Sequence, residues 1–150
     1  QILFPYAKNN TEINLLRVIR MLSIHDLVEI DAGDTFLFDE EGMKGKFERE
    51  KLAAKKIFGI LDEPLSSEFY NLWIEFEEEE TPDAIFACAI DRMMPFILNT
   101  YTSGKSWTEA GVTEKQVRNM LENAICRASD DMGDCFQLLM KKCFDEKKFS

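Results

Sequence analysis

The sequence has little histidine and little cysteine. His25 is its only histidine, and no two of its four cysteines form a CxxC pair. The cysteines are Cys88, Cys126, Cys135 and Cys143. This spacing does not suggest a disulfide framework, so we expect reduced structural thiols, as in a cytosolic protein. No signal peptide is readable either, and we therefore expect a cytoplasmic location.

Long apolar runs and an excess of basic residues are also missing. No uncharged run approaches the ~18 apolar residues of a membrane span, so we expect no membrane partner. Lys and Arg total 18 against 28 Asp and Glu, which gives a net charge of −10. This balance argues against binding a nucleic-acid polymer. A small anionic substrate stays possible, because a bound cation or a local arginine can reverse the field inside a pocket.

Only four prolines occur in the 150 residues, and alternating β-branched runs are few. Apolar residues instead recur at spacings of three and four, which is typical of helices. The length suits one domain with a sizeable core. We therefore expect an all-α fold, with residues 1–150 forming a single compact multi-helix bundle.

The pattern predicts helices at residues 11–28, 47–61, from about 66 to 80, and 82–98, with one helix or a pair after 113. Asn10 or Thr11 is the expected cap of the first helix, and Ser66 or Ser67 that of the third. Thr81-Pro82 is typical of a helix start. Residues 113–116 (Thr-Glu-Lys-Gln) are a capping-box candidate. Residues 104–111 are expected to form a loop.

His25 stands near the end of an apolar stripe on the first predicted helix. Val18, Leu22, His25 and Glu29 share one helical face, and Asp26 is the next position round. Burying an imidazole beside carboxylates is costly unless a cation compensates them. Nitrogen and carboxylate ligands suit Mn, Fe, Co, Ni or Zn. Alone, the His-Asp pair favours a hydrogen-bonded core histidine over a metal ligand.

Asp91 lies within the most apolar predicted helix, and its own stripe faces the core. Pro95 should disturb the helix at Asp91, because its ring displaces the carbonyl four residues earlier. A buried acid needs a partner, either a basic side chain or a metal ion. Glu77 to Glu80 are interpreted as a solvated helix end, although Glu75, Glu77 and Glu78 could approach a pocket, because their helix directly precedes the Asp91 helix.

Together, His25-Asp26 and the later Asp91 resemble the H…HD…D pattern of HD-domain metal-dependent phosphohydrolases. The stretch HDLVEIDAGD (residues 25–34), followed by residues 89–92 (AIDR), is similar to the small 5′-deoxynucleotidase-like branch. The resemblance implies that His25, Asp26 and Asp91 are metal ligands for one divalent ion: Mn, Co, Fe, Ni, Zn or Mg. It implies that Glu29 activates the attacking water, and that Asp34 lies beside the phosphate.

The family pattern also needs an earlier histidine, which this chain lacks. We expect it on an N-terminal helix or helices preceding residue 1. The implied activity is removal of the 5′-phosphate from (deoxy)nucleoside monophosphates by a homodimer. The alternatives are an HD-fold hydrolase of another small phosphorylated metabolite, and a catalytically silent HD-fold protein with an interaction or regulatory role.

Overall fold

The computed structural model describes residues 12–102 and 104–149, and every regular element among them is helical. The all-α expectation is therefore confirmed. The elements are α2 (Leu15–Ile24), η1 (His25–Val28), α3 (Glu29–Ala32), α4 (Glu40–Met43), α5 (Lys46–Phe58), α6 (Leu65–Glu78), α7 (Pro82–Tyr101), α8 (Lys105–Ala110), α9 (Glu114–Val117), η2 (Arg118–Glu122), α10 (Asn123–Cys126) and α11 (Asp130–Asp145). They fall into two compact units, with the boundary inside α7. One is formed by residues 14–87, and the other contains the described residues from 88 onward. The single-domain organisation stays a prediction.

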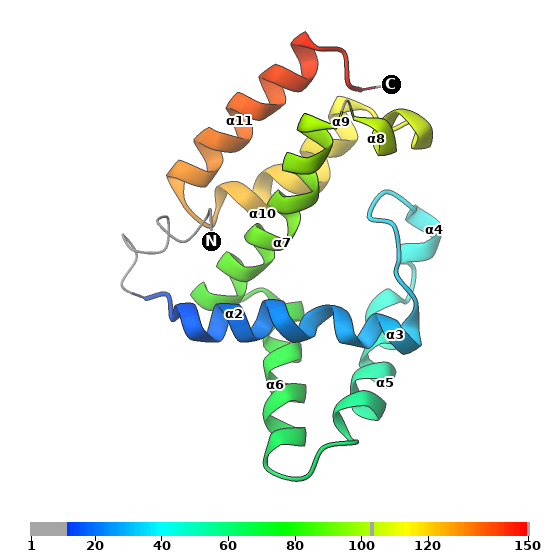
Figure 1. Cartoon of the computed structure of the whole chain (residues 1–150), viewed down its shortest axis with the longest axis vertical. Coiled ribbons are helices and arrows are strands. Elements are labelled where there is room, and N and C mark those ends of the chain that lie inside the picture. Colours follow the sequence, from blue (N-terminus) through cyan, green and yellow to red (C-terminus); the bar gives the residue numbers. More distant parts are fainter. Residues whose placement is uncertain (1–11, 103, 150) are drawn as a thin grey trace. The chain divides into compact units, whose positions relative to one another are not determined.

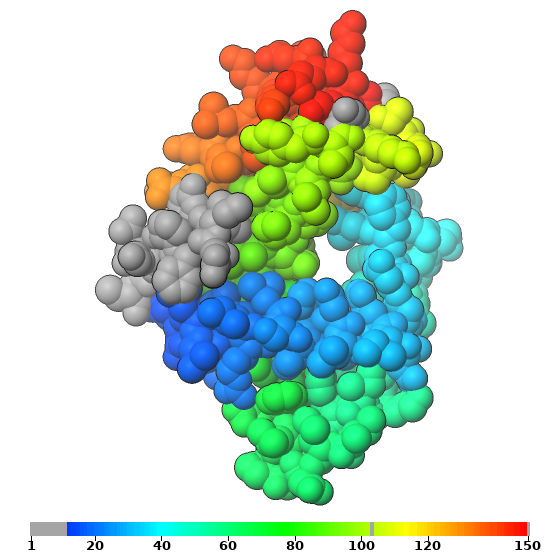
Figure 2. Space-filling view, in the orientation of Figure 1, coloured from blue at the N-terminus to red at the C-terminus, as the bar shows by residue number. Residues whose placement is uncertain are grey.

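In the unit of residues 14–87, α5 and α6 pack side by side and are joined by a short loop (Figure 1). The run from α2 through η1 to α3 crosses this pair, with α2 against α6 and with η1 and α3 against α5. Apolar side chains from α2, α5 and α6 form the core, including Val18, Met21, Phe58, Trp73 and Phe76. In the space-filling view, α2 to α3 forms a continuous band of surface on this unit (Figure 2).

The start of α2 is held by a polar network rather than by the expected cap. Asn14 caps the helix by accepting from the backbone of Leu16 and Arg17; Asn10 and Thr11 lie outside the described residues. The backbone N–H of Asn14 donates to the buried carboxylate of Asp83 at 2.6 Å. Arg17 donates to Asp83 at 3.1 Å and to Glu75, and the bond to Glu75 raises the pKa of the guanidinium.

The predicted C-terminal end of the first helix, which was expected to span residues 11–28, is wrong. The α-helix stops at Ile24, and His25–Val28 form a 3-10 turn before a further α-helical turn ends at Gly33 with φ +81°. A 3-10 turn has three residues per turn, so it rotates side chains away from the α-helical stripe. His25 and Glu29 therefore leave the common face that the sequence indicates, and the break falls at the candidate ligand pair.

Two further local expectations are wrong and two are confirmed. Helix α6 begins at Leu65 without a side-chain cap, and Ser67 instead donates to Glu63. Residues 105–110 are helical rather than a loop, bracketed by glycines with positive φ. The start of α7 is confirmed, since Pro82 is its first residue and Thr81 accepts from the backbone of Ala84. The capping box of Thr113 and Gln116 is also confirmed.

The second unit contains the later part of α7 with helices α8 to α11. Helix α11 packs against α10 and contributes fully buried side chains to this core: Met132, Phe136, Met140 and Cys143. Beyond it, the buried ammonium of Lys148 donates to the carbonyl of Thr100, and Phe149 stacks on Trp107 at 5.3 Å. The C-terminal segment is thus part of the fold. None of the described helices, α7 included, combines the length and apolarity needed to cross a bilayer.

We expect Phe136→Ala to lower the free energy of unfolding by about 3–5 kcal/mol, because it empties a fully buried site. Leu138→Ala on the same helix is the matched control, because Leu138 is 71% exposed; it should change stability by less than about 0.5 kcal/mol. Urea unfolding followed by circular dichroism measures both. Equal losses in the two variants would contradict the assigned burial of α11.

Candidate metal centre

The 3-10 turn η1 fixes the orientation of the only imidazole. His25 Nδ1 lies 3.1 Å from the carbonyl oxygen of Leu22. A carbonyl can only accept, so Nδ1 carries the proton and donates it. In the neutral ring this leaves Nε2 with a lone pair, as in metal-binding histidines whose other nitrogen is held by a backbone carbonyl.

The His25 ring is also held by packing. It lies against Phe76 of α6, with the ring centroids 4.6 Å apart. The side chain of His25 is 10% exposed, whereas that of Asp26 is 70% exposed. The imidazole is therefore anchored in the core of its unit, and its carboxylate neighbour opens to solvent where a ligand can reach it.

The contact made by Nε2 tests whether the pair suits a metal ion. Nε2 lies 3.0 Å from Asp26 Oδ1. A lone pair and a carboxylate oxygen repel each other at this distance unless a cation, either a proton or a metal ion, lies between them. Two ligand atoms each about 2.1 Å from one cation and at right angles are about 3.0 Å apart. The geometry of His25 and Asp26 therefore fits two adjacent positions of a coordination sphere.

These two residues do not complete a metal site by themselves. Within residues 12–102 and 104–149, no three His, Cys, Asp or Glu side chains are grouped so that they could hold one ion. Asp91 is partly buried on α7 and belongs to the other unit, so its role as a third ligand stays a prediction. The histidine expected upstream of residue 1 lies outside the described residues and stays a prediction as well.

Glu29, the proposed base, begins α3 directly after the 3-10 turn. The pKa of Glu29 is raised to about 7, chiefly by burial and also by the nearby charges of Asp26 and Asp34, while the charge of Lys46 lowers it. Asp34 is exposed, just beyond Gly33. The structure thus brings His25, Asp26, Glu29 and Asp34 into one electrostatically linked segment. A carboxyl group with a pKa near neutrality suits proton transfer.

Sequence reasoning missed the ion pair of Lys46 and Glu50. Lys46 Nζ lies 2.7 Å and 2.8 Å from the two carboxylate oxygens of Glu50, which is only 2% exposed. Burial raises the pKa of Glu77, which is partly buried on α6, and Lys46 and His25 counteract the shift. Glu77 is therefore partly buried and interacts electrostatically with the histidine, rather than forming only a solvated end. An i,i+4 Lys–Glu spacing is common on exposed helix faces, so spacing alone could not identify this pair.

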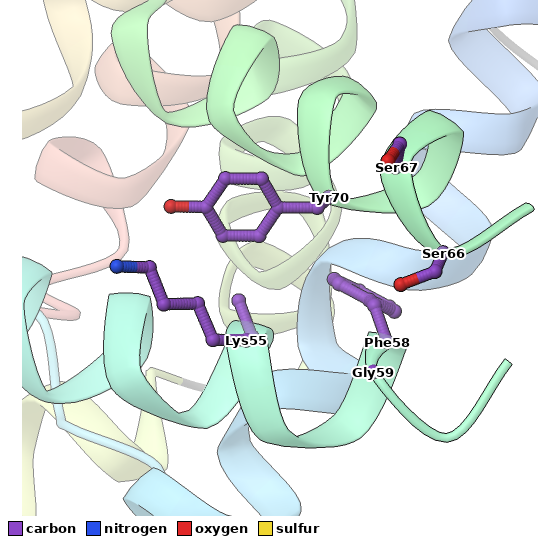
Figure 3. A pocket seen from close by; sticks show the side chains of 7 residues that line it. Lys55, Phe58, Gly59, Ser66, Ser67 and Tyr70 are labelled. Atoms are coloured by element: carbon purple, nitrogen blue, oxygen red, sulfur yellow. The ribbon is translucent and has the colours of Figure 1, made fainter. Parts of the chain in front are cut away.

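A separate pocket lies where the end of α5 faces the start of α6. Its lining includes Lys55, Phe58, Ser66 and Tyr70 (Figure 3). Its volume is about 150 Å³, less than the roughly 300–1,000 Å³ of small-molecule sites. It contains neither His25 nor any carboxylate. The chemistry therefore points to the His25–Asp26 segment and away from this pocket.

Comparison with known proteins identifies the family of the chain. The model of the HD domain family matches residues 2–132. The chain belongs to the HD domain family. This match includes residues of both units and every candidate site residue, from His25 to Asp91. The stretch after residue 132, which contains most of α11, lies beyond the matched part of the HD domain.

A solved HD domain structure is similar along nearly the whole chain. It is a predicted metal-dependent phosphohydrolase from Magnetospirillum magnetotacticum MS-1, with 39% identity and a TM-score of 0.91. The alignment covers 99% of this chain and 74% of the other. The resemblance to HD-domain metal-dependent phosphohydrolases is thereby confirmed, and membership implies a divalent metal ion.

Curated relatives of this HD domain are similar over a shorter stretch. The 5′-deoxynucleotidase HDDC2 of Danio rerio is 36% identical over 81 residues, and that of Homo sapiens is 34% identical over 80 residues. These alignments cover 54% and 53% of this chain. They span only 40% and 39% of the relatives' own lengths.

The raised pKa of Glu29 predicts a pH-dependent stability in the metal-free protein. A carboxyl with a folded pKa of about 7 binds its proton more tightly when folded, so stability falls as pH rises from about 4.5 to 7. Glu29→Gln removes this loss. Relative to wild type, the variant should therefore gain about 1 kcal/mol between pH 5 and pH 8, because solvent screens a partly exposed group.

Urea unfolding in EDTA at pH 5 and pH 8 measures this difference. Glu48→Gln removes the same charge from an exposed position on α5 and serves as the control. A Glu29→Gln variant whose advantage over wild type is the same at both pH values, or larger at pH 5, would rule out the assigned burial of Glu29.

Proposed function

We propose that this HD domain belongs to a metal-dependent phosphomonoesterase that releases the 5′-phosphate of (deoxy)nucleoside monophosphates. The observation that carries the proposal is the His25–Asp26 pair, whose Nε2 and Oδ1 lie 3.0 Å apart, as two adjacent ligands of one metal ion do. Similarity to the 5′-deoxynucleotidases HDDC2 supports the substrate class. The homodimer and the cytoplasmic location stay predictions.

Each residue of the segment has a distinct role in this proposal. His25 would hold the metal through Nε2, and its ring is fixed by Leu22 and Phe76. Asp26 supplies an oxygen from the exposed side, and Asp91 is the further ligand that the family pattern predicts. When bound, a divalent cation polarises a phosphoryl oxygen and makes a bound water more acidic.

In this proposal Glu29 takes the proton from the attacking water, a role that is supported by its pKa near 7 because such a group is an effective base at neutral pH. The two carboxylates of Asp34 and Glu29 interact electrostatically, since the charge of Asp34 raises the pKa of Glu29. We assign Asp34 to orienting the water or the substrate. A bond from the water oxygen to phosphorus forms as the bond from phosphorus to the nucleoside 5′-oxygen breaks. The proton taken from the water balances the one that the leaving oxygen gains, so the nucleoside leaves as an alcohol.

The test is phosphate release by the purified protein with Mn²⁺ or Co²⁺ from a panel of deoxynucleoside and ribonucleoside monophosphates. We expect turnover by wild type and a fall of at least about 100-fold in kcat/KM for Asp26→Asn, because losing a metal ligand exceeds losing an outer-shell partner. Asp31→Asn is the matched control. Asp31 is a nearby carboxylate on α3, and it pairs with Lys56 at 2.6 Å.

The panel also separates the alternatives. Turnover confined to other phosphorylated metabolites would replace the nucleotide substrate while keeping the mechanism. No turnover by wild type would support the catalytically silent alternative. Turnover that survives Asp26→Asn at the wild-type rate would show that the His25–Asp26 segment is not the reacting site.

A further inference from the structure

The candidate centre carries an excess of negative charge, and its proposed carboxylate ligands contribute to that excess. Carboxylates from three parts of the chain act on one another there: Asp26, Glu29 and Asp34 around the 3-10 turn, Glu50 on α5 and Glu77 on α6. A phosphomonoester is itself an anion, and the whole chain carries a net charge of −10. An anionic substrate needs positive charge at this place in the fold.

Lys46 is built into the structure at that place. It is the first residue of α5, which packs against both η1 and α3. Its ammonium lies within 2.8 Å of both carboxylate oxygens of Glu50, and its side chain is only 25% exposed. Although burial alone would lower the pKa of Lys46, its hydrogen bond to Glu50 raises it, so the ammonium stays charged.

The charge of Lys46 also acts beyond its ion-pair partner. It lowers the pKa of Glu29 on α3 and of Glu77 on α6, opposing the effect of burial on each. Glu77 in turn interacts with His25. One cation is thus coupled to the proposed base and to a carboxylate beside the histidine, and its own position is fixed by a buried anchor.

We propose that Lys46 is a positioning residue that balances the charge of the His25–Asp26 centre: it limits the attraction of the carboxylates for a divalent cation and allows an anionic phosphoester to approach. The effect on substrate rests on the proposed function, whereas the effect on the cation does not. A purely structural ion pair would behave differently, since breaking it would loosen the site and weaken the binding of both cation and anion.

The test compares Lys46→Gln with wild type in two measurements at low ionic strength. Calorimetric titration gives the Mn²⁺ dissociation constant, which should fall about threefold or more, because removing a positive charge strengthens the remaining negative field. In the phosphatase assay KM for the nucleotide should rise by a similar factor, with kcat changed less. Both effects should shrink in 0.5 M salt, where screening is strong.

Two matched variants serve as controls for the charge of Lys46 and for its position, and a third variant tests the proposal from the opposite sign of charge. Lys46→Arg keeps the charge and should restore wild-type values. Lys55→Gln removes the same charge about 13 Å further along α5, beside the separate pocket, and should leave the Mn²⁺ affinity unchanged. Glu50→Gln has the opposite sign and should weaken Mn²⁺ binding, so it tests the proposal even where Lys46→Gln fails to fold.

The outcomes separate this proposal from the proposed function. Unchanged or weaker Mn²⁺ binding by Lys46→Gln, or shifts of the same sign for Lys46→Gln and Glu50→Gln, would overturn the role of Lys46. A wild-type protein that binds Mn²⁺ but hydrolyses no phosphoester would overturn the function instead. The Mn²⁺ affinities would then still decide whether Lys46 balances the charge of the centre.

Discussion

The site depends on one hydrogen bond, from His25 Nδ1 to the carbonyl oxygen of Leu22. Because a carbonyl cannot donate, this bond fixes which ring nitrogen carries the proton. The other nitrogen then faces Asp26 at 3.0 Å as a lone pair facing an anion, an arrangement that only a cation makes favourable. The 3-10 turn and the packing of Phe76 matter because they hold the ring in this orientation.

Assembling this centre creates a local cost in stability. Carboxylates are crowded around the histidine, and burial raises the pKa of both Glu29 and Glu77. In a metal-free protein part of the crowding is relieved by protonation of Glu29 and part by the ammonium of Lys46. Binding a divalent cation relieves it more fully, which couples metal binding to stability. Conflicts of this kind are expected at functional sites, where activity and stability make opposing demands.

The sequence predicted the features that depend on local signals. Thr113 and Gln116 form their capping box, Thr81-Pro82 begins α7, and the apolar periodicity located the main helices. The features it missed depend on tertiary contacts or on local signals that fit two structures equally well. Asn14 caps α2 within a network that includes Asp83, far along the chain, and nothing local distinguishes Asn14 from Asn10 as a cap. The helix at residues 105–110 lies between two glycines, a spacing that is equally typical of a loop.

The same distinction separates the two interpretations of His25. A core histidine and a metal-ligand histidine can share the bond from Nδ1 to a backbone carbonyl, so an apolar stripe with one imidazole is compatible with both. The two kinds of histidine differ in which atom lies against Nε2. Here it meets the oxygen of a carboxylate that is 70% exposed, on the next residue of a 3-10 turn. A 3-10 turn separates successive side chains by about 120° and an α-helix by about 100°, so the turn by itself does not bring Asp26 toward His25. The contact therefore depends on the side-chain conformations, in which His25 Nε2 reaches Asp26 Oδ1 at 3.0 Å, and sequence periodicity carries no information on those.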